Sequence, residues 1–476
     1  MAAAAFMDLL DGTIVQVALP SIQRDLKADD AILQWTVSGY TLAFALLLVT
    51  GARLGSRVGR RRCFLAGLAL FVIASAAAAA AQSGGMLVGF RAVQGAASAL
   101  MLPQVLSFIQ AEFTGAAKSK AFATYGMVLA LAGAAGPLLG GVLVEANIAG
   151  LAWRSIFLVN VPVGIAAFVF GGRLIPESVP DRSQRLNPAG TSVLTLALLA
   201  IFYPLIQGRQ LGWPPWAFAC LGASVPLLAL FALIQARSVR AKRPPLIDLA
   251  LFRSRGTCVG LVIALLFFGA TSCFFVLTLY LQSGLGFSPL RTGVSFIPFS
   301  IAVIIGSAGA APLGQRLGRL AVAAGTLGTT AALVSMVALV GHYGSGLHAW
   351  QLAPSLAVAG LAFGVASGTL ADIVLGRVPA RLAAGASGLI NTVIQLGSVL
   401  AIAVVGAIFF DSLSGRPDVR AFTSAATSGL WYLAASCALA TIGTVFLPSR
   451  RGAMVAPPPA TEPASDDASG WLSPAD

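Results

Sequence analysis

Long apolar stretches alternate with short polar ones along almost the whole chain. A transmembrane helix needs about 20 mostly apolar residues, and fourteen stretches approach this length. Because backbone groups in a bilayer must be hydrogen-bonded within the segment, these stretches are predicted to be helices. The predicted spans lie near residues 2–22, 35–54, 63–82, 86–110, 121–145, 155–173, 188–207, 216–236, 256–282, 289–312, 320–341, 350–375, 386–410 and 427–447.

The end of the chain differs from the rest. From Pro448 onward it contains three consecutive prolines, Pro457 to Pro459, and two adjacent aspartates, Asp466 and Asp467. No periodic apolar pattern runs through these residues. A segment that cannot bury apolar surface does not fold alone, so 448–476 is predicted to be a disordered tail.

Composition agrees with a membrane protein and excludes other classes. Of the 476 residues 57% are hydrophobic and only 10% are charged, against about 25% charged in a soluble domain. So few charges cannot cover a soluble globule, and so many apolar residues exclude disorder. Five scattered cysteines exclude a disulfide scaffold. We therefore expect an all-α polytopic membrane protein.

The net charge of +13 would be compatible with nucleic-acid binding if the basic residues formed one surface. They do not. When the predicted loops are assigned alternately to the two sides, 22 of the 30 Lys and Arg fall on the side of the amino terminus and seven on the other. This bias follows the positive-inside rule. We expect a cell-membrane protein with both termini cytoplasmic and no nucleic-acid partner.

The first apolar stretch is not a cleavable signal peptide by its sequence. It lacks a basic leader and contains two aspartates. Few residues precede Asp8, so either the helix begins at once or the true start lies further upstream.

Ionisable residues inside the spans are the first candidates for function, because burying them in a membrane is expensive. Asp8 and Asp11 are three residues apart on the first span, which places them on one helical face. Each costs about 2.5–3.5 kcal/mol near a helix centre, so this face should point into a bundle or a watery cavity. Proton binding and attraction of a cationic substrate are both compatible with this, as is simple solvation of Asp8 near the interface.

Two further charges lie in or near spans. Arg91 is the only basic residue in the interior of a predicted span, more than two residues from either end; it stays charged and needs a partner or water. It either regulates proton binding by a nearby carboxylate or forms a static ion pair. Asp372 lies late in the twelfth span, and is a second protonation site or an interfacial residue paired with Arg377.

Catalytic and cofactor signatures are missing from the sequence. It contains no nucleotide-binding loop, no HExxH and no GxSxG. His342 and His348 flank a short loop, but two histidines without a third ligand are weak evidence for a metal. We expect no enzyme activity, cofactor or metal. The membrane potential, about 2.3 kcal/mol per charge per 100 mV, is the energy source that remains.

Several motifs resemble those of the major facilitator superfamily. The loop after the second span is similar to that superfamily's basic cytoplasmic loop, although Ser56 stands where Asp is usual. The sequence Arg91-Ala92-Val93-Gln94-Gly95 resembles its fourth-helix motif, and 136–141 (GPLLGG) resembles the fifth-helix motif of its antiporters. Glycines permit close helix packing, arginines can bind helix C-termini, and proline loosens a helix. The candidate conformational residues are Gly51, Arg53, Gly55, Arg57, Gly59, Arg60, Arg61, Gly95, Gly136, Pro137, Gly140 and Gly141.

Three more stretches are similar to fourteen-span drug:proton antiporters: 10–20 (LDGTIVQVALP), 153–162 (WRSIFLVNVP) and the segment from Tyr280 to Pro289. The resemblance implies two six-helix bundles with two inserted helices. The domains would then be 1–175, a linker with two spans at 176–253, 254–447, and the tail. A short echo of the basic loop after the tenth span, 312–319 (PLGQRLGR), agrees with an internal repeat.

The function implied by this resemblance is efflux of amphipathic or cationic small molecules in exchange for protons, by a monomer in the bilayer. Asp8, Asp11, Arg91 and Asp372 would serve proton coupling. A dedicated exporter of one metabolite, such as a self-made antibiotic, is the alternative; the 26 arginines against four lysines indicate a high-GC genome. A transport-inactive membrane sensor is a third possibility.

Overall fold

The computed structural model describes residues 1–178, 187–241, 245–375, 378, 383–413 and 418–447. These residues form helices and short connections, with no strand among them. Within these described ranges, fourteen helical segments are long and apolar enough to cross a membrane, which confirms the number predicted from the apolar pattern. The tail predicted to be disordered and Arg377 lie outside the described residues.

The first six spans and the central pair are made of nine α-helices. The first six spans are α1 (Ala2–Leu26), α2 (Asp30–Val58), α3 (Arg60–Ala79), α4 (Gly84–Glu112), α5 (Gly115–Ala146), and α6 (Ser155–Leu158) with α7 (Asn160–Leu174). The central pair is α8 (Pro188–Gln207) and α9 (Pro215–Arg240).

The last six spans include two that are interrupted. They are α10 (Arg255–Phe268) with α11 (Cys273–Leu279), α12 (Pro289–Ser295) with α13 (Ile297–Leu317), α14 (Arg319–Tyr343), α15 (Ala349–Leu375), α16 (Ala383–Leu413) and α17 (Val419–Gly443). A 3₁₀ turn at Gly269–Ser272 joins α10 to α11, and a π-helical turn at Tyr280–Gly284 follows α11.

Several helices begin at a polar residue that caps the first turn. Asp29 accepts a hydrogen bond from the Ile32 amide at 2.8 Å before α2, and Asp418 accepts one from the Ala421 amide at 2.7 Å before α17. Such side chains satisfy amides that have no partner within the helix. The polar residues between apolar stretches therefore fix where these spans start.

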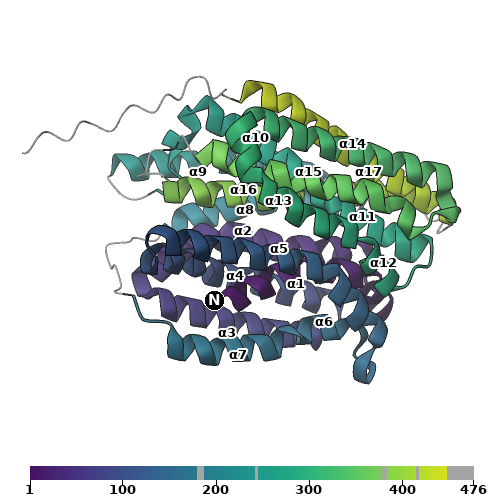
Figure 1. Ribbon diagram of the computed structural model, residues 1–476, viewed down its shortest axis with the longest axis horizontal. Helices are drawn as coiled ribbons and strands as arrows, with labels where there is room; N and C mark the ends of the chain where they lie inside the picture. The colour runs from purple at the N-terminus through teal and green to yellow at the C-terminus, as the bar shows by residue number, and fades with distance from the viewer. Residues whose placement is uncertain (179–186, 242–244, 376–377, 379–382, 414–417, 448–476) are drawn as a thin grey trace, which may run out of the picture.

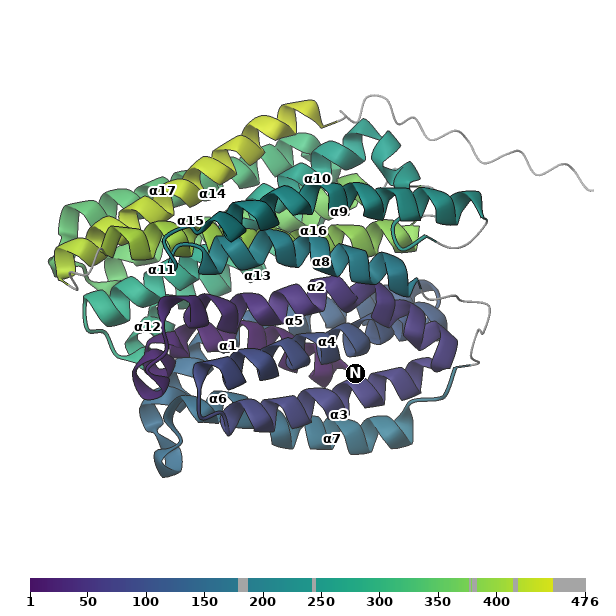
Figure 2. The ribbon, with the colours of Figure 1, turned by 180° about the vertical axis from the view of Figure 1, so that it is seen from behind.

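The helices form two bundles that lie side by side with their axes roughly parallel (Figure 1). The amino-terminal six spans make one bundle and the carboxy-terminal six the other, and α2 packs against α16 along the seam between them. Figure 2 shows α8 and α9 on the flank of this seam, where α8 contacts both α2 and α16. Helix α9 buries only 17% of its apolar window, as expected for a peripheral helix whose surface faces lipid.

Glycines bring the same pair of helices together in each bundle. In the first bundle, a Cβ added at Gly95 of α4 would stand 2.1 Å from the Tyr40 carbonyl oxygen of α2. In the second, a Cβ added at Gly306 of α13 would stand 2.2 Å from the Leu361 carbonyl oxygen of α15. The second and fourth spans thus pack as the tenth and twelfth do, because in each pair a glycine lies against the backbone of the partner helix.

Two turns also repeat. Gly59 connects α2 to α3 with φ of 114°, and Gly318 connects α13 to α14 with φ of 55°. Both angles lie where only glycine is unstrained, and in each case the next helix begins with an arginine, Arg60 or Arg319. The similarity between the two basic loops therefore extends to their backbone conformation. We call the end of the molecule that carries Arg60–Arg62 the basic end.

Gly95→Ala is expected to lower the thermal unfolding temperature of the purified protein by several degrees, because the new Cβ would collide with backbone. Overpacking of this kind costs about 1–3 kcal/mol. Gly89→Ala is the matched control on the same helix, since an added Cβ there meets nothing within 4 Å. Equal unfolding temperatures for the two variants would contradict close packing of α2 on α4.

Candidate functional site

A buried ion pair joins α1 to α4 inside the first bundle. Arg91 donates from Nη1 to Asp11 Oδ2, and the two side chains are 1% and 0% exposed. Arg91 also donates from Nε to the Thr36 carbonyl oxygen of α2 and from Nη1 to Gln94 Oε1, both at 3.0 Å. These three hydrogen bonds of the guanidinium thus all go to acceptors of the first bundle.

The second oxygen of the Asp11 carboxylate is held by two amides. Asn160 Nδ2 of α7 donates to Asp11 Oδ1 at 2.8 Å, and Gln94 Nε2 does so at 3.3 Å. Gln94 also donates to Ser75 Oγ of α3 at 2.8 Å. Side chains of α4 and α7 therefore bind the Asp11 carboxylate of α1, and Ser75 of α3 holds Gln94 in place. Buried charges are tolerated in a membrane when they are paired and hydrogen-bonded in this way.

Asp8 is linked to the same network through a tyrosine. Tyr40 of α2 donates its hydroxyl to Asp8 Oδ1, and the same hydroxyl lies 3.0 Å from Ser98 Oγ of α4. The Arg91 guanidinium carbon lies 4.3 Å from the centre of the Tyr40 ring, within the range of a cation–π contact. Asp11 is sealed, whereas Asp8 is only partly buried. Both aspartates face the interior of the first bundle.

Asp372 is not part of this network. Its side chain is exposed near the basic end of α15, and no described hydrogen bond or ion pair joins it to Asp8, Asp11 or Arg91. The pairing considered with Arg377 falls outside the described residues.

The basic loop binds the ends of neighbouring segments. Arg61 donates to the Gly172 carbonyl oxygen near the end of α7, and Arg60 donates from Nη1 to the Ser107 carbonyl oxygen of α4 at 3.4 Å. Arg53 donates to the Pro245 carbonyl oxygen, in the connection after α9. Cations are favourable at helix C-termini, where carbonyl groups lack partners. Arg57 has an exposed side chain.

Two glycines of the predicted basic loop lie instead on the last turns of α2 and pack inside the bundle. A Cβ added at Gly51 would stand 2.0 Å from the Ala99 carbonyl oxygen, and one added at Gly55 would stand 2.0 Å from Gln104 Oε1. Ser56 donates to the Ala52 carbonyl oxygen of its own helix at 3.3 Å.

The fifth-helix motif lies between α1 and the second bundle. A Cβ added at Gly136 would overlap Thr13 of α1, and one at Gly140 would stand 2.9 Å from the Ile14 carbonyl oxygen. On the other side, a Cβ at Gly141 would stand 2.6 Å from the Pro289 carbonyl oxygen. The motif therefore allows α5 to touch both neighbours through its backbone.

The contact between α5 and α12 closes the seam at the end opposite the basic end. A Cβ added at Gly293 of α12 would stand 2.3 Å from the Pro137 carbonyl oxygen. Glu145 Oε2 accepts a hydrogen bond from the Leu290 amide at 3.0 Å, and Gln282 Nε2 donates to the Val17 carbonyl oxygen at 2.8 Å. Both hydrogen bonds join the two bundles.

A cavity of about 530 Å³ lies in the seam next to this closure. Its walls come from α1 and α5 of the first bundle and from α10, α11, α13 and α15 of the second. None of the described residues that line it is acidic, basic or histidine. Four residues of α1 line the cavity: Leu9, Thr13, Gln16 and Val17. Helix α1 therefore presents one face to the cavity and another to the ion pair.

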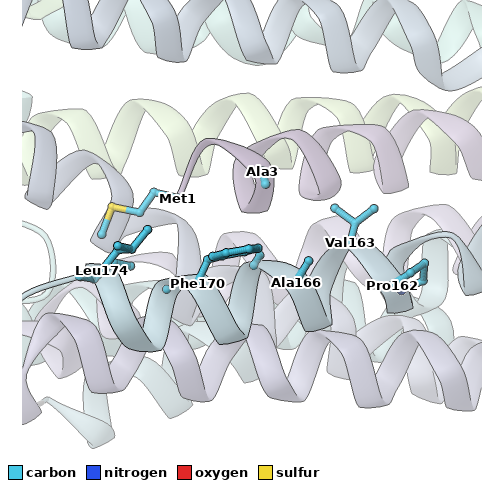
Figure 3. A pocket seen from close by; sticks show the side chains of 10 residues that line it. Met1, Ala3, Pro162, Val163, Ala166, Phe170 and Leu174 are labelled. Carbon is cyan, nitrogen blue, oxygen red and sulfur yellow. The ribbon is translucent and has the colours of Figure 1, made fainter.

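A second depression, of about 550 Å³, lies between the start of α1 and α7 (Figure 3). Its side chains are apolar; Phe170 and Leu174 are 60% and 76% exposed. It carries no group suited to proton transfer, and its surface suits lipid chains. Among the described residues, no cluster of His, Cys, Asp and Glu could hold a metal.

The model of the Major Facilitator Superfamily matches residues 1–402. The chain belongs to the Major Facilitator Superfamily. It is therefore a membrane transporter and not an enzyme.

Solved structures of this fold superpose on it. A D-xylose–proton symporter has a TM-score of 0.67 at 12% identity, with 95% of this chain and 97% of that one covered. A bacterial homolog of the human lysosomal transporter Spinster has a TM-score of 0.60 at 16% identity, with 94% of each chain covered.

Curated members of the superfamily are closer in sequence. The "Probable actinorhodin transporter" of Streptomyces coelicolor is 39% identical, covering 87% of this chain and 72% of that protein. The "Tetracenomycin C resistance and export protein" of Streptomyces glaucescens is 33% identical, covering 86% and 74%. The "Multidrug resistance protein Stp" of Mycobacterium tuberculosis is 32% identical, covering 86% and 74%.

Arg91→Met is expected to destabilise this major facilitator by about 3–5 kcal/mol, because it leaves the buried Asp11 without its cation. The double variant Arg91→Met/Asp11→Asn should recover at least half of that loss, since neither charge then remains. Thermal unfolding in micelles measures both. Arg209→Met is the control: its 2.9 Å pair with Asp30 is partly exposed, and such pairs contribute about 0–1 kcal/mol. Additive losses in the double variant would contradict the pairing.

Proposed function

We propose that this chain exports amphipathic small molecules in exchange for protons, with the central cavity as the substrate site and Asp11 as the coupling carboxylate. One observation carries the proposal. Among the described residues, a fully buried ion pair joins α1 to α4 directly behind the face of α1 that lines an uncharged cavity. Relatives named as exporters and resistance proteins support the direction of transport.

The cavity and its closure fit alternating access. The positive-inside rule places the basic end in the cytoplasm, so the contacts of Gly141 and Glu145 with α12 would close the outer side. Substrate would then enter from the cytoplasm. Export requires these contacts to separate while the basic end closes, a rocking of one bundle against the other. Both termini would be cytoplasmic and the protein a monomer in the cell membrane. Residues 1–175 and 254–447 would form the two moving domains, with 176–253 as the linker.

Proton binding at Asp11 would control this rocking. While Asp11 is ionised it holds Arg91, Asn160 and Gln94 around α1. A proton taken up from outside, after substrate leaves, would remove the charge and loosen that contact. Thr13 lies two residues along the same helix and packs on Gly136, so a shift of α1 would reach the hinge of α5. A proton shifts the equilibrium between two conformations only if it binds more tightly to one of them. Asp11 would provide this difference in proton affinity, because its contacts would differ between the two conformations.

Asp8 would hold the second proton of the site. Asp8 and Asp11 share one cation, Arg91, so the buried cluster has one negative charge in excess when both carboxylates are ionised. An uncompensated charge within a membrane costs several kcal/mol, which favours a neutral Asp8 whose partner is the Tyr40 hydroxyl. Asp8 is nearer than Asp11 to the amino-terminal, cytoplasmic end of α1 and is partly exposed, so the proton would leave Asp11 for the cytoplasm through it. Asp372 would play no part in this path.

A dedicated exporter of one metabolite is the second candidate, and the relatives named for actinorhodin and tetracenomycin C favour it. Export of many unrelated compounds from cells that carry the gene would favour the multidrug function. Resistance to a single compound would favour the dedicated one.

Asp11→Asn is expected to reduce export driven by a pH gradient at least tenfold in inverted membrane vesicles, because the substituted amide cannot carry a proton. The measurement is dye accumulation with and without a protonophore. Asp372→Asn makes the same change at an exposed carboxylate and should keep most of the rate. If Asp11→Asn exports with unchanged rate and pH dependence, Asp11 does not couple the cycle.

Gly141→Ala should open the closed end of the seam, because the new Cβ would stand 2.6–2.7 Å from backbone atoms of Pro289 and Leu290. Spin labels at Ile148 and Val294, both exposed, would report a longer distance in a background without the five cysteines. Gly126→Ala, on the same helix but with nothing within 4 Å, should leave the distance unchanged. Identical distance distributions in both variants would refute this role of Gly141.

A further inference from the structure

The central cavity has two unlike walls. The wall contributed by the second bundle is aromatic: Phe268, Phe274, Phe296, Phe299 and Phe363 all line it. Their rings touch one another in sequence. Phe274 lies 4.8 Å from Phe299 and 4.9 Å from Phe296, both edge to face, and Phe268 lies 5.4 Å from Phe363 in the same arrangement. Phe299 lies 6.1 Å from Phe363 in a tilted arrangement and joins the two groups. These distances lie in the range of favourable ring pairs, so the five rings form one connected aromatic surface.

The wall contributed by the first bundle is smooth. On α5 it is formed by Gly126, Leu129, Ala130, Gly133 and Pro137. A Cβ added at Gly126 would meet nothing within 4 Å, and one added at Gly133 would meet only Leu9 at 3.7 Å. The missing side chains thus leave open space that faces the aromatic wall. A planar molecule could lie against both surfaces, with its faces covered by rings and its edges free.

One buried acceptor in the cavity wall has no partner among the described residues. The hydroxyls of Thr13 and Thr271 already donate to backbone carbonyl oxygens of their own segments, at 3.0 Å and 2.8 Å. Gln16 Oε1 is buried and accepts no hydrogen bond from the described residues. A buried acceptor without a partner costs about 1–3 kcal/mol, and a ligand that brings an O–H or N–H donor would remove this cost.

The uncharged lining of the cavity favours neutral ligands over cations. Among the described lining residues there is no carboxylate to pair with a cation, and Asp8 and Asp11 face the first bundle instead. Aromatic rings alone attract cations through their faces. That attraction would have to offset the hydration that a cation loses on entry, and no carboxylate among the described lining residues would help it. Neutral ligands lose less hydration on entry and keep the full gain from ring stacking.

We infer that the cavity selects uncharged planar aromatic molecules that carry hydrogen-bond donors, with Phe363 and its neighbouring rings as the stacking surface and Gln16 as the acceptor. This inference rests on the proposed function, because it takes the cavity as the substrate site. It deepens that function by naming the substrate class, and it replaces cationic compounds with neutral ones.

The test compares three fluorescent probes of equal ring size on the purified full chain in nanodiscs: 1-pyrenemethanol, which is neutral with a donor; 1-methylpyrene, which has no donor; and 1-pyrenemethylamine, which is a cation at pH 7. We expect 1-pyrenemethanol to bind at least tenfold more tightly than the amine. Binding of 1-pyrenemethylamine as tight as or tighter than that of 1-pyrenemethanol would overturn the inference.

Variants assign the preference to residues. Gln16→Leu should weaken 1-pyrenemethanol about fivefold, the size of one neutral hydrogen bond, and leave 1-methylpyrene unchanged. Phe363→Ala should weaken both about tenfold. Phe218→Ala is the matched control, since Phe218 is 60% exposed on α9, away from the cavity. Unfolding temperatures identify any variant that fails to fold, and Phe363→Leu then replaces Phe363→Ala. Unchanged affinities in both cavity variants would overturn the inference.

The outcome is separable from that of the proposed function. Suppose that vesicles export a cationic dye in a proton-dependent way, but that the protein binds 1-pyrenemethanol no more tightly than 1-pyrenemethylamine. Only the substrate class is then wrong. If 1-pyrenemethanol binds in the cavity as described but no pH gradient drives its export, the substrate class stands and the coupling proposal fails.

Discussion

The cost of keeping charge inside a membrane governs the arrangement of the first bundle. Asp11 and Arg91 each cost about 2.5–3.5 kcal/mol at the centre of an isolated helix, so neither is tolerated without the other. Their pairing fixes α1 against α4. The remaining donors and acceptors come from Thr36, Gln94 and Asn160, which bring α2 and α7 to the same point. One ion pair therefore determines how four helices meet.

Helix α1 separates this chemistry from the substrate. Its charged face is sealed by the bundle, while Leu9, Thr13 and Gln16 face the seam. Carboxylate and cavity thus lie on two sides of one helix, and in the proposed cycle movement of that helix would connect them. Gly136 and Gly140 add no side chain of α5 to the contact with Thr13 and Ile14 of α1, so the two helices pack closely there. Coupling then requires no direct contact between proton and substrate.

The sequence is informative where a single residue carries the signal. Fourteen apolar stretches predicted the fourteen spans, and a charge inside a span singled out Asp11 and Arg91 without any partner being known. The sequence says little about a residue whose role depends on a partner far away along the chain. Ser75 stands in an alanine-rich stretch with nothing to mark it, and Asn160 and Gln94 lay in recognised motifs without a role. Asp372 was selected by the same rule as Asp11, yet its side chain is exposed. The rule measures position along a helix and not the direction in which a side chain points.

The central claim is that proton and substrate bind to different faces of α1 and are coupled through it. The most direct test is to titrate a transported compound into the purified protein in weakly buffered micelles while a pH dye records protons. The account predicts that binding releases protons from the native chain. Asp11→Asn should bind the compound with an affinity within a few fold of the native value but release none, because linkage is lost while the cavity is intact. If Asp11→Asn loses binding altogether, proton and substrate share one site and the account is wrong.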